Sequence, residues 1–185
     1  RMLRAMLTDS TREWTLEQLL SETGWEDQVH VAGAGKKLEE QGLLVLSESS
    51  SRMVSLGDEG QRASENGLLE SRLWDWMSEL EGEKRTMKSL MSSDFERAET
   101  GPGIGILKGL GIDIESGIFI ISDDSKISKE IDRRSEFILS LSEGEVESSN
   151  LDSEMLSHFS SRSGLLDFED VTIRTWKLTK SGSSL

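Results

Sequence analysis

The residues that most strongly suggest chemistry form a glycine-rich stretch followed by two lysines, Ala32-Gly33-Ala34-Gly35-Lys36-Lys37. A phosphate-binding loop of the Gly-x-x-x-x-Gly-Lys-Ser/Thr type would have glycine where this chain has His30 and a hydroxyl residue where it has Lys37. Such a loop also follows a strand, whereas the residues before Ala32 have the pattern of a turn between helices. We therefore predict a helix, in which each glycine costs about 1 kcal/mol relative to alanine.

A second glycine-rich stretch, Thr100–Gly105, lacks both the Gly-x-Gly-x-x-Gly spacing and the Gly-Lys-Ser/Thr sequence of phosphate loops. It contains Pro102, the only proline of the chain. Proline is favoured at the first position of a helix. We predict that Pro102 begins the helix that carries Leu107 and Leu110.

Catalytic and metal-binding patterns are missing. The acidic runs Glu79–Glu83 and Glu143–Glu147 offer paired carboxylates, but no histidine or metal-ligand spacing accompanies them, so we predict solvated faces. The chain has no cysteine and only two histidines, His30 and His158, of which His158 is expected at the surface. We predict no catalytic residue and no metal site.

Composition limits the alternatives further. The chain has 185 residues, and its 35 acidic and 21 basic side chains give a net charge of −14. The length allows one ordinary domain or two or three very small ones, and a hydrophobic content of 35% indicates small cores. No apolar run approaches the roughly 20 residues of a membrane span. These values argue against a strongly basic nucleic-acid binder and against a membrane partner.

Two segments repeat one another at a constant offset of 122 residues, since Gly42–Gly60 aligns without a gap on Gly164–Gly182. A weaker third copy, Gly109–Asp123, lies between them. The repeat predicts three units of roughly 60 residues each. The identical pairs are Gly42 and Gly164, Leu43 and Leu165, Leu44 and Leu166, Arg52 and Arg174, Leu56 and Leu178, and Gly60 and Gly182.

Each copy has the pattern of a helix followed by a β-hairpin. Apolar residues alternate over Leu44–Leu46, a serine-rich stretch Ser47–Ser51 is expected to turn the chain, and alternation resumes over Val54–Leu56. We predict hairpins within Leu44–Leu56 and Leu166–Leu178, and a shorter one that turns at Ser116-Gly117. The core is expected to contain Leu44, Leu46, Val54 and Leu56 in the first unit, and Leu166, Trp176 and Leu178 in the third.

Further helical patterns precede each hairpin. Thr15 and Gln18 form a capping-box pair at the start of one such helix. In another, Trp76 cannot share the core-facing stripe of Trp74, and it is a candidate for contact with a partner or a neighbouring unit. Helices followed by a two-stranded wing are the winged-helix plan. We predict an α+β, mainly helical chain of three tandem winged-helix units, 1–67 with a trailing helix, 68–125 and 126–185.

Positive charge is concentrated near the end of the chain. Val171–Leu185 contains three basic residues and no acidic one. Because salt screens charge over about 8 Å, such a local basic wing can bind phosphates despite the net negative charge. Arg52 is the equivalent of Arg174 in the first wing and ranks second, because Glu48 and Asp58 are its neighbours. The candidate nucleic-acid-binding residues are Arg174, Lys177, Lys180, Arg52, Lys36 and Lys37.

Three ordered motifs resemble the N-terminal winged-helix array of the archaeal and eukaryotic-type phenylalanyl-tRNA synthetase alpha subunit. The first is VHVAGAGKKLEEQGLLVL with MVSLGDEGQRASENGLLESRLW, where Leu56, Glu59-Gly60, Glu65, Gly67, Glu70 and Arg72 carry the likeness. The second is GIGILKGLGIDI, Gly103–Ile114, and the third is SGLLDFEDVTIRTWKLTKSGSSL. Together they cover nearly the whole chain.

The resemblance implies a tRNA-binding appendage of the phenylalanine-tRNA ligase alpha subunit, which contacts tRNA(Phe) in the cytoplasm. The chain then ends where this family continues into a class II catalytic domain, so the sites for ATP, Mg²⁺ and phenylalanine have no positions here. The beta subunit would be reached through that catalytic domain. The alternative function is a DNA-binding transcriptional regulator with tandem winged helices, and a protein-interaction array is a third.

Overall fold

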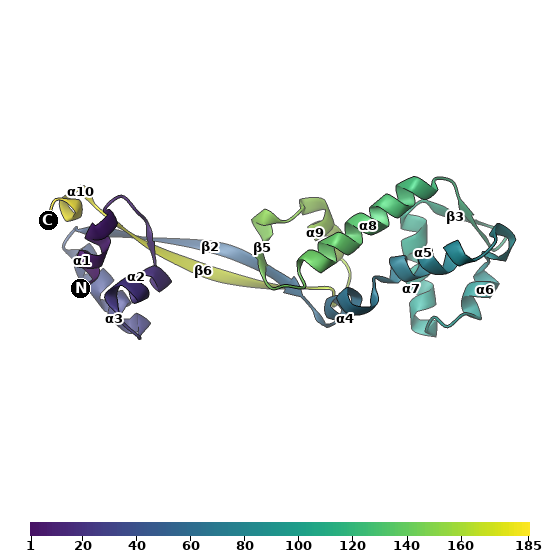
Figure 1. The fold of residues 1–185 in the computed structure, drawn as a ribbon, viewed down its shortest axis with the longest axis horizontal. Coiled ribbons are helices and arrows are strands. Elements are labelled where there is room, and N and C mark those ends of the chain that lie inside the picture. Colours follow the sequence, from purple (N-terminus) through teal and green to yellow (C-terminus); the bar gives the residue numbers. More distant parts are fainter. The chain divides into compact units, whose positions relative to one another are not determined.

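The two repeated segments form single long strands rather than hairpins. In the computed structural model, which describes residues 1–185, β2 runs continuously over Leu44–Leu56 and β6 over Leu166–Leu178 (Figure 1). The two strands are neighbours in a four-stranded sheet of order β1-β6-β2-β5. The hairpins predicted within Leu44–Leu56 and within Leu166–Leu178 are therefore wrong.

The difference arises from the residues expected to turn the chain. A two-residue hairpin turn needs positive φ at its central residues, and Ser47–Ser51 contains no glycine, asparagine or aspartate to adopt it readily. Ser116 and Gly117 do have positive φ, 51° and 80°. They join β3 (Ile112–Glu115) to β4 (Ile118–Ile121) in an antiparallel pair, which confirms the middle hairpin.

The chain divides into two units, and both long strands run from one into the other. Unit 1 comprises Arg1–Arg52 and Asp170–Leu185, and unit 2 comprises Met53–Glu169. The predicted boundaries 1–67, 68–125 and 126–185 do not coincide with these units. The last part of the chain returns to the first part because its strand pairs there.

Unit 1 contains four helices, one complete short strand and parts of the two long strands. Thr15 and Gln18 form the predicted capping box at the start of α2, where each side chain accepts a hydrogen bond from the backbone N–H of the other residue. The elements are α1 (Met2–Met6), a 3₁₀ turn (Leu7–Asp9), β1 (Trp14–Thr15), α2 (Leu16–Thr23), α3 (Gln28–Glu40), the first part of β2, the last part of β6, and α10 (Lys180–Ser183).

Unit 2 is mainly helical, so the α+β, mainly helical class is confirmed. No helix in either unit is both long and apolar enough to cross a bilayer. The elements are the end of β2, α4 (Asp58–Asn66), α5 (Leu69–Glu79), a 3₁₀ turn (Gly82–Lys84), α6 (Met87–Met91), α7 (Arg97–Gly109), β3, β4, α8 (Asp124–Ser140), β5 (Val146–Glu147), a 3₁₀ turn (Ser148–Asn150), α9 (Ser153–Ser160) and the start of β6.

Pro102 lies inside α7 and not at its first position as predicted. The helix begins at Arg97, where Glu96 and Glu99 form a capping box. Proline has no N–H to donate within the helix. The cap at Glu96 therefore determines the start of α7.

Each long strand contributes to two separate cores. Leu44, Trp176 and Leu178 are buried in the core of unit 1, whereas Val54 and Leu166 are buried in a core of unit 2. The predicted burial of these five residues is confirmed, and Leu46 and Leu56 are partly buried. The expectation that Leu44 and Val54 share a core is wrong, because β2 does not fold back. Another core of unit 2 lies beneath the β3–β4 hairpin and includes Leu73, Met77, Leu107, Ile112 and Phe119.

The repeat of 122 residues is visible in the pairing of the strands. Trp14 of β1 lies opposite Trp176, and Val146 of β5 lies opposite Val54. Val54 and Trp176 occupy equivalent places in the repeat, so β2 receives an edge strand in unit 2 as β6 does in unit 1.

The backbone contacts beside the strands repeat as well. The N–H of Thr179 donates to the carbonyl of Leu43, and the N–H of Gly57 donates to the carbonyl of Leu165, each at 3.0 Å. A Cβ atom at Gly182 or Gly60 would overlap the same two carbonyl groups. The conserved spacing of these glycines in the two copies thus has a steric reason.

One order of elements occurs three times along the chain: helix, short strand, two further helical segments, and a longer strand. It begins with α1, β1, α2 and α3 in unit 1. In unit 2 it recurs as α5, an isolated bridge from Thr86 to Ile118, α6 and α7, followed by the β3–β4 hairpin. It recurs again as α8, β5, the 3₁₀ turn and α9, followed by β6.

Candidate nucleic-acid interface

The arginines predicted to bind phosphates are paired with carboxylates from the neighbouring strand. Arg174 Nε of β6 lies 2.6 Å from Glu48 Oε1 of β2, and Arg52 Nε of β2 lies 3.3 Å from Asp170 Oδ1 of β6. The two pairs occupy equivalent places in the repeat. The expectation that Val171–Leu185 carries uncompensated positive charge is therefore wrong for Arg174, because its acid comes from a distant segment.

Lys177 is also paired. Its Nζ lies 3.5 Å from Glu13 Oε1, which precedes β1 at the edge of the sheet. All three pairs are more than half exposed at the basic residue. Exposed pairs of this kind contribute at most about 1 kcal/mol, so a phosphate can compete for these cations.

The other three predicted residues, Lys36, Lys37 and Lys180, are exposed and take part in no ion pair. α3 buries Val31 and Gly35 on one side, and Gly35 faces Trp176 of β6. Lys37 lies in the last turn of α3. Lys180 follows Thr179, whose hydroxyl donates to the carbonyl of Gly42 at 2.7 Å, just beyond α3.

These contacts bring Lys180 to the end of α3 that carries Lys36 and Lys37. Of the six predicted residues, three therefore gather at one end of α3, and the other three lie along the strands in ion pairs. The structure offers these cations no carboxylate or imidazole arranged for acid–base chemistry. Exposed ammonium groups such as those of Lys36, Lys37 and Lys180 are able to bind an anion.

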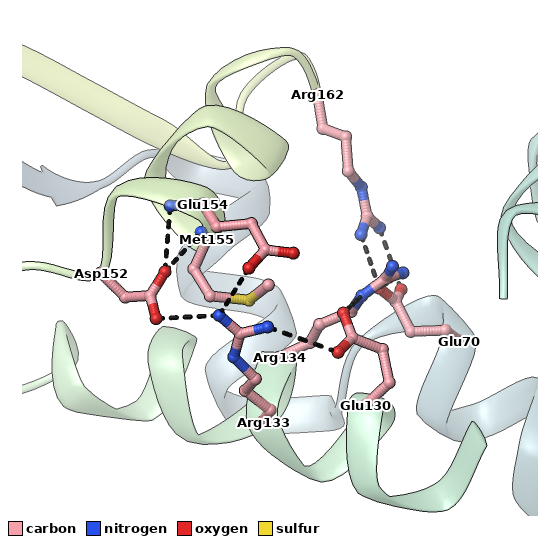
Figure 2. A network of polar contacts seen from close by, with 8 residues as sticks. All are labelled: Glu70, Glu130, Arg133, Arg134, Asp152, Glu154, Met155 and Arg162. Atoms are coloured by element: carbon pink, nitrogen blue, oxygen red, sulfur yellow. Dashed lines mark hydrogen bonds and ion pairs between the residues drawn. The ribbon is translucent and has the colours of Figure 1, made fainter. Parts of the chain in front are cut away.

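Unit 2 contains a different polar cluster, which sequence reasoning missed (Figure 2). The carboxylate of Glu70 on α5 is fully buried and accepts hydrogen bonds from Arg162 Nη1 at 2.7 Å and Nη2 at 3.1 Å. Arg134 Nη1 of α8 lies 3.4 Å from the same carboxylate. Burial raises the pKa of Glu70, but the hydrogen bonds and charge of Arg162, together with Arg134, outweigh it and hold the pKa below its usual value.

The cluster continues along α8. Arg133 Nη2 lies 2.8 Å from Asp152 Oδ2 and 3.0 Å from Glu154 Oε2. Asp152 also accepts hydrogen bonds from the first N–H groups of α9, which with Arg133 lower its pKa. These pairs tie α5, α8 and α9 together, and their role is structural. The available signal was the position of Glu70, three residues before buried Leu73 on the core-facing stripe.

His158 is half-buried beside this cluster, not at the surface as predicted. Its Nε2 is buried without a hydrogen-bond partner. Burial, and then the charges of Arg134 and Arg162, lower its pKa. This shift favours the neutral form of His158, whose ring packs edge-to-face against Phe159 with the ring centroids 4.9 Å apart.

Trp76, a candidate for partner contact, belongs to the core beneath the β3–β4 hairpin. It makes edge-to-face contacts with Phe95 and Phe119, with ring centroids 6.3 and 6.4 Å away. It also lines an open hollow of about 490 Å³ between α5 and the α6–α7 turn. No group of three or more histidine, aspartate or glutamate side chains is arranged to hold a metal ion.

Two known proteins are similar to most of this chain. The phenylalanine–tRNA ligase alpha subunit of Methanothermobacter thermautotrophicus is 28% identical over 162 residues, which cover 84% of this chain and 31% of that protein. The corresponding subunit of Methanopyrus kandleri is 26% identical over 170 residues, which cover 80% and 30%. The chain thus spans about a third of the length of these relatives. No family model matches it.

Proposed function

We propose that this chain is the tRNA-binding, non-catalytic part of an archaeal-type phenylalanine-tRNA ligase alpha subunit. The observation that carries the proposal is the similarity to two such subunits over at least 80% of this chain. This similarity supports a role in protein synthesis. The beta subunit, ATP, Mg²⁺ and phenylalanine would bind other parts of the ligase, which acts in the cytoplasm.

We call each of the three repeats of this element order a module: α1 to α3, α5 to α7, and α8 to α9, each with the strands that follow it. The repeated order supports the interpretation of each module as a winged helix. Three helical segments with a short strand, followed by two longer strands, are the winged-helix plan. In this proposal the module under β3 and β4 has its own wing. The other two modules share one pair of strands, because each of β2 and β6 serves both.

The chemistry of the exposed residues fits binding of a nucleic acid through its phosphates. Lys36, Lys37 and Lys180 are exposed cations without carboxylate partners. Lysine contacts to phosphate release counterions, so the affinity of such a site falls steeply as salt rises.

The test is a competition between two nucleic acids for the full chain. Fluorescence anisotropy at about 0.1 M salt should show binding to labelled tRNA(Phe) that a duplex DNA with the same number of phosphates displaces poorly. DNA that competes as well as tRNA, or better, would contradict the proposal. That result would favour the transcriptional regulator.

A further inference from the structure

The acidity of this protein is divided very unequally between its two units. Unit 1 contains nine basic and ten acidic side chains, which leaves a net charge near −1, whereas unit 2 contains 12 and 25, which leaves −13. The inequality cannot be seen along the sequence, because unit 1 is built from both ends of the chain. Unit 1 is therefore the part that a polyanion can approach without strong repulsion.

Six basic side chains of unit 1 take part in no ion pair. Arg1, Arg4 and Arg12 lie near the start of the chain, where Arg12 packs over the ring of Trp14. Lys36, Lys37 and Lys180 lie on α3 and α10, where Glu39 and Glu40 are the nearest acids in sequence to the two α3 lysines. Arg52, Arg174 and Lys177 each pair with a neighbouring carboxylate, which a phosphate would have to displace. Lys36 and Lys37 project from the exposed part of α3, and Lys180 is held near the end of α3 by the bonds of Thr179 to Gly42 and Leu43. In unit 2, by contrast, an approaching phosphate meets about two acids for each base.

The two glycines of α3 differ in what requires them. A Cβ atom at Gly35 would lie 2.7 Å from Nε1 of Trp176, so packing against β6 explains this glycine. A Cβ atom at Gly33 would meet no atom within 4 Å, and Gly33 is exposed. Glycine costs about 1 kcal/mol in a helix interior, and no contact within the chain explains Gly33. It leaves the backbone open to a closely approaching partner one turn from Lys36.

We infer that RNA contact is confined to unit 1, is centred on the exposed side of α3 with Lys36 and Lys37, and extends to Lys180. This inference rests on the proposed function and names its surface. Screening limits attraction and repulsion to about 8 Å near physiological salt. The near-neutral unit 1 can therefore bind phosphates locally, while the charge of unit 2 excludes RNA from its own surface.

The experiment measures the affinity of the full chain for tRNA(Phe) as a function of salt. The test variant is Lys36→Glu/Lys37→Glu, and the matched control is Lys126→Glu/Lys129→Glu on α8. The control lysines are exposed, lie on one helix and take part in no ion pair, and both variants change the net charge equally. Lys→Gln versions of both pairs provide a second comparison, because glutamine places no negative charge at the C-terminal end of α3, where the helix dipole disfavours it. Thermal melts show that each variant is folded.

Loss of two phosphate contacts should reduce the salt slope by about 1.4 to 1.8 and weaken binding about 25- to 60-fold at 0.1 M salt. The control variant should bind within about threefold of the parent, because distant charges are screened. Equal losses in both variants, or a loss in the control alone, would overturn the inference and leave the proposed function standing. A parent chain that does not bind tRNA would overturn the proposed function itself.

Discussion

Gly33 and Gly35 stand two residues apart on one helix but have opposite roles in stability. Replacing Gly35 with alanine places a methyl group 2.7 Å from Nε1 of Trp176, whose ring is buried in the core of unit 1. Overpacking of this kind costs about 1–3 kcal/mol, partly offset by the better helix propensity of alanine. We expect Gly35→Ala to lower the free energy of unfolding of unit 1.

Gly33→Ala is the matched comparison. Its methyl group enters open space, so the variant should be more stable than the parent by up to about 1 kcal/mol. Urea melts followed by circular dichroism give both values. If Gly35→Ala were as stable as Gly33→Ala, the close packing of α3 on Trp176 would be wrong.

Glu70 provides a second prediction at the level of single residues. Removing its carboxylate with Glu70→Ala leaves Arg134 and Arg162 without their buried partner, which typically costs about 3–5 kcal/mol. Glu59→Gln, which breaks the exposed pair with Arg62, is the control and should change stability by less than about 1 kcal/mol. If both variants lost the same free energy of unfolding in urea melts at neutral pH, the buried ion pairs of Glu70 would contribute no more stability than an exposed pair.

The lowered pKa of Glu70 also sets the sign of its pH dependence. Since the folded chain binds this proton more weakly than the unfolded chain does, ionised Glu70 stabilises the fold above the ordinary pKa of 4.5. That contribution is lost as the pH falls through the lower folded value. When the pH is lowered from neutral to below 4.5, the free energy of unfolding should therefore fall less for Glu70→Gln than for the parent chain. Urea melts at a series of pH values measure this difference. A variant as acid-sensitive as the parent would contradict this assignment.

At the residue scale, short-range sequence patterns were sufficient to predict a helix cap and a hairpin turn. The pairing of Thr15 with Gln18 and the turn at Ser116-Gly117 depend on residues close in sequence, and both were predicted correctly. The partner of Arg174 lies 126 residues away, and the two partners of Glu70 lie 64 and 92 residues away. No spacing rule reaches such pairs, so the compensation of the basic stretch could not be predicted.

At the scale of elements, the main finding is that β2 and β6 each bury residues in a core of unit 1 and in a core of unit 2. The alternating pattern of Leu44–Leu56 was interpreted as two arms of a hairpin, and its burial parity was predicted correctly. Alternation specifies which residues face a core, but not which strand pairs with them. Ser47–Ser51 lacks a residue suited to a tight turn, and this was the available warning.

This sharing predicts which segments become unstable together. Trp176→Ala should cost about 3–5 kcal/mol and speed hydrogen exchange in α1, α2 and α3, which are far away in sequence, because Trp176 belongs to the core of unit 1. Val54→Ala is the matched variant at the equivalent place in the repeat, and it should instead speed exchange in α8 and α9. Hydrogen exchange followed by mass spectrometry of the full chain measures both.

The opposite pattern would contradict shared strands. In a chain with separate hairpins, Trp176→Ala would loosen α9 and Val54→Ala would loosen α3, their neighbours in sequence. Comparing the two variants in one experiment also separates a local effect from a general loss of stability.

At the scale of the whole molecule, the sequence predicted a mainly helical α+β chain with repeats, but not how its charge is distributed. Along the sequence, each of the ranges 1–67, 68–125 and 126–185 has more acidic than basic side chains. The structure joins Arg1–Arg52 with Asp170–Leu185, and this regrouping leaves one unit near −1 and the other at −13. Only the long-range pairing of β2 with β6 makes that division visible.

The most direct test of the account is the hydrogen exchange of the full chain with and without saturating tRNA(Phe). The account predicts slower exchange in α3 and around Lys180–Ser183, and unchanged exchange in α5, α7 and α8 of unit 2. Protection confined to unit 2, or no protection in either unit, would contradict it.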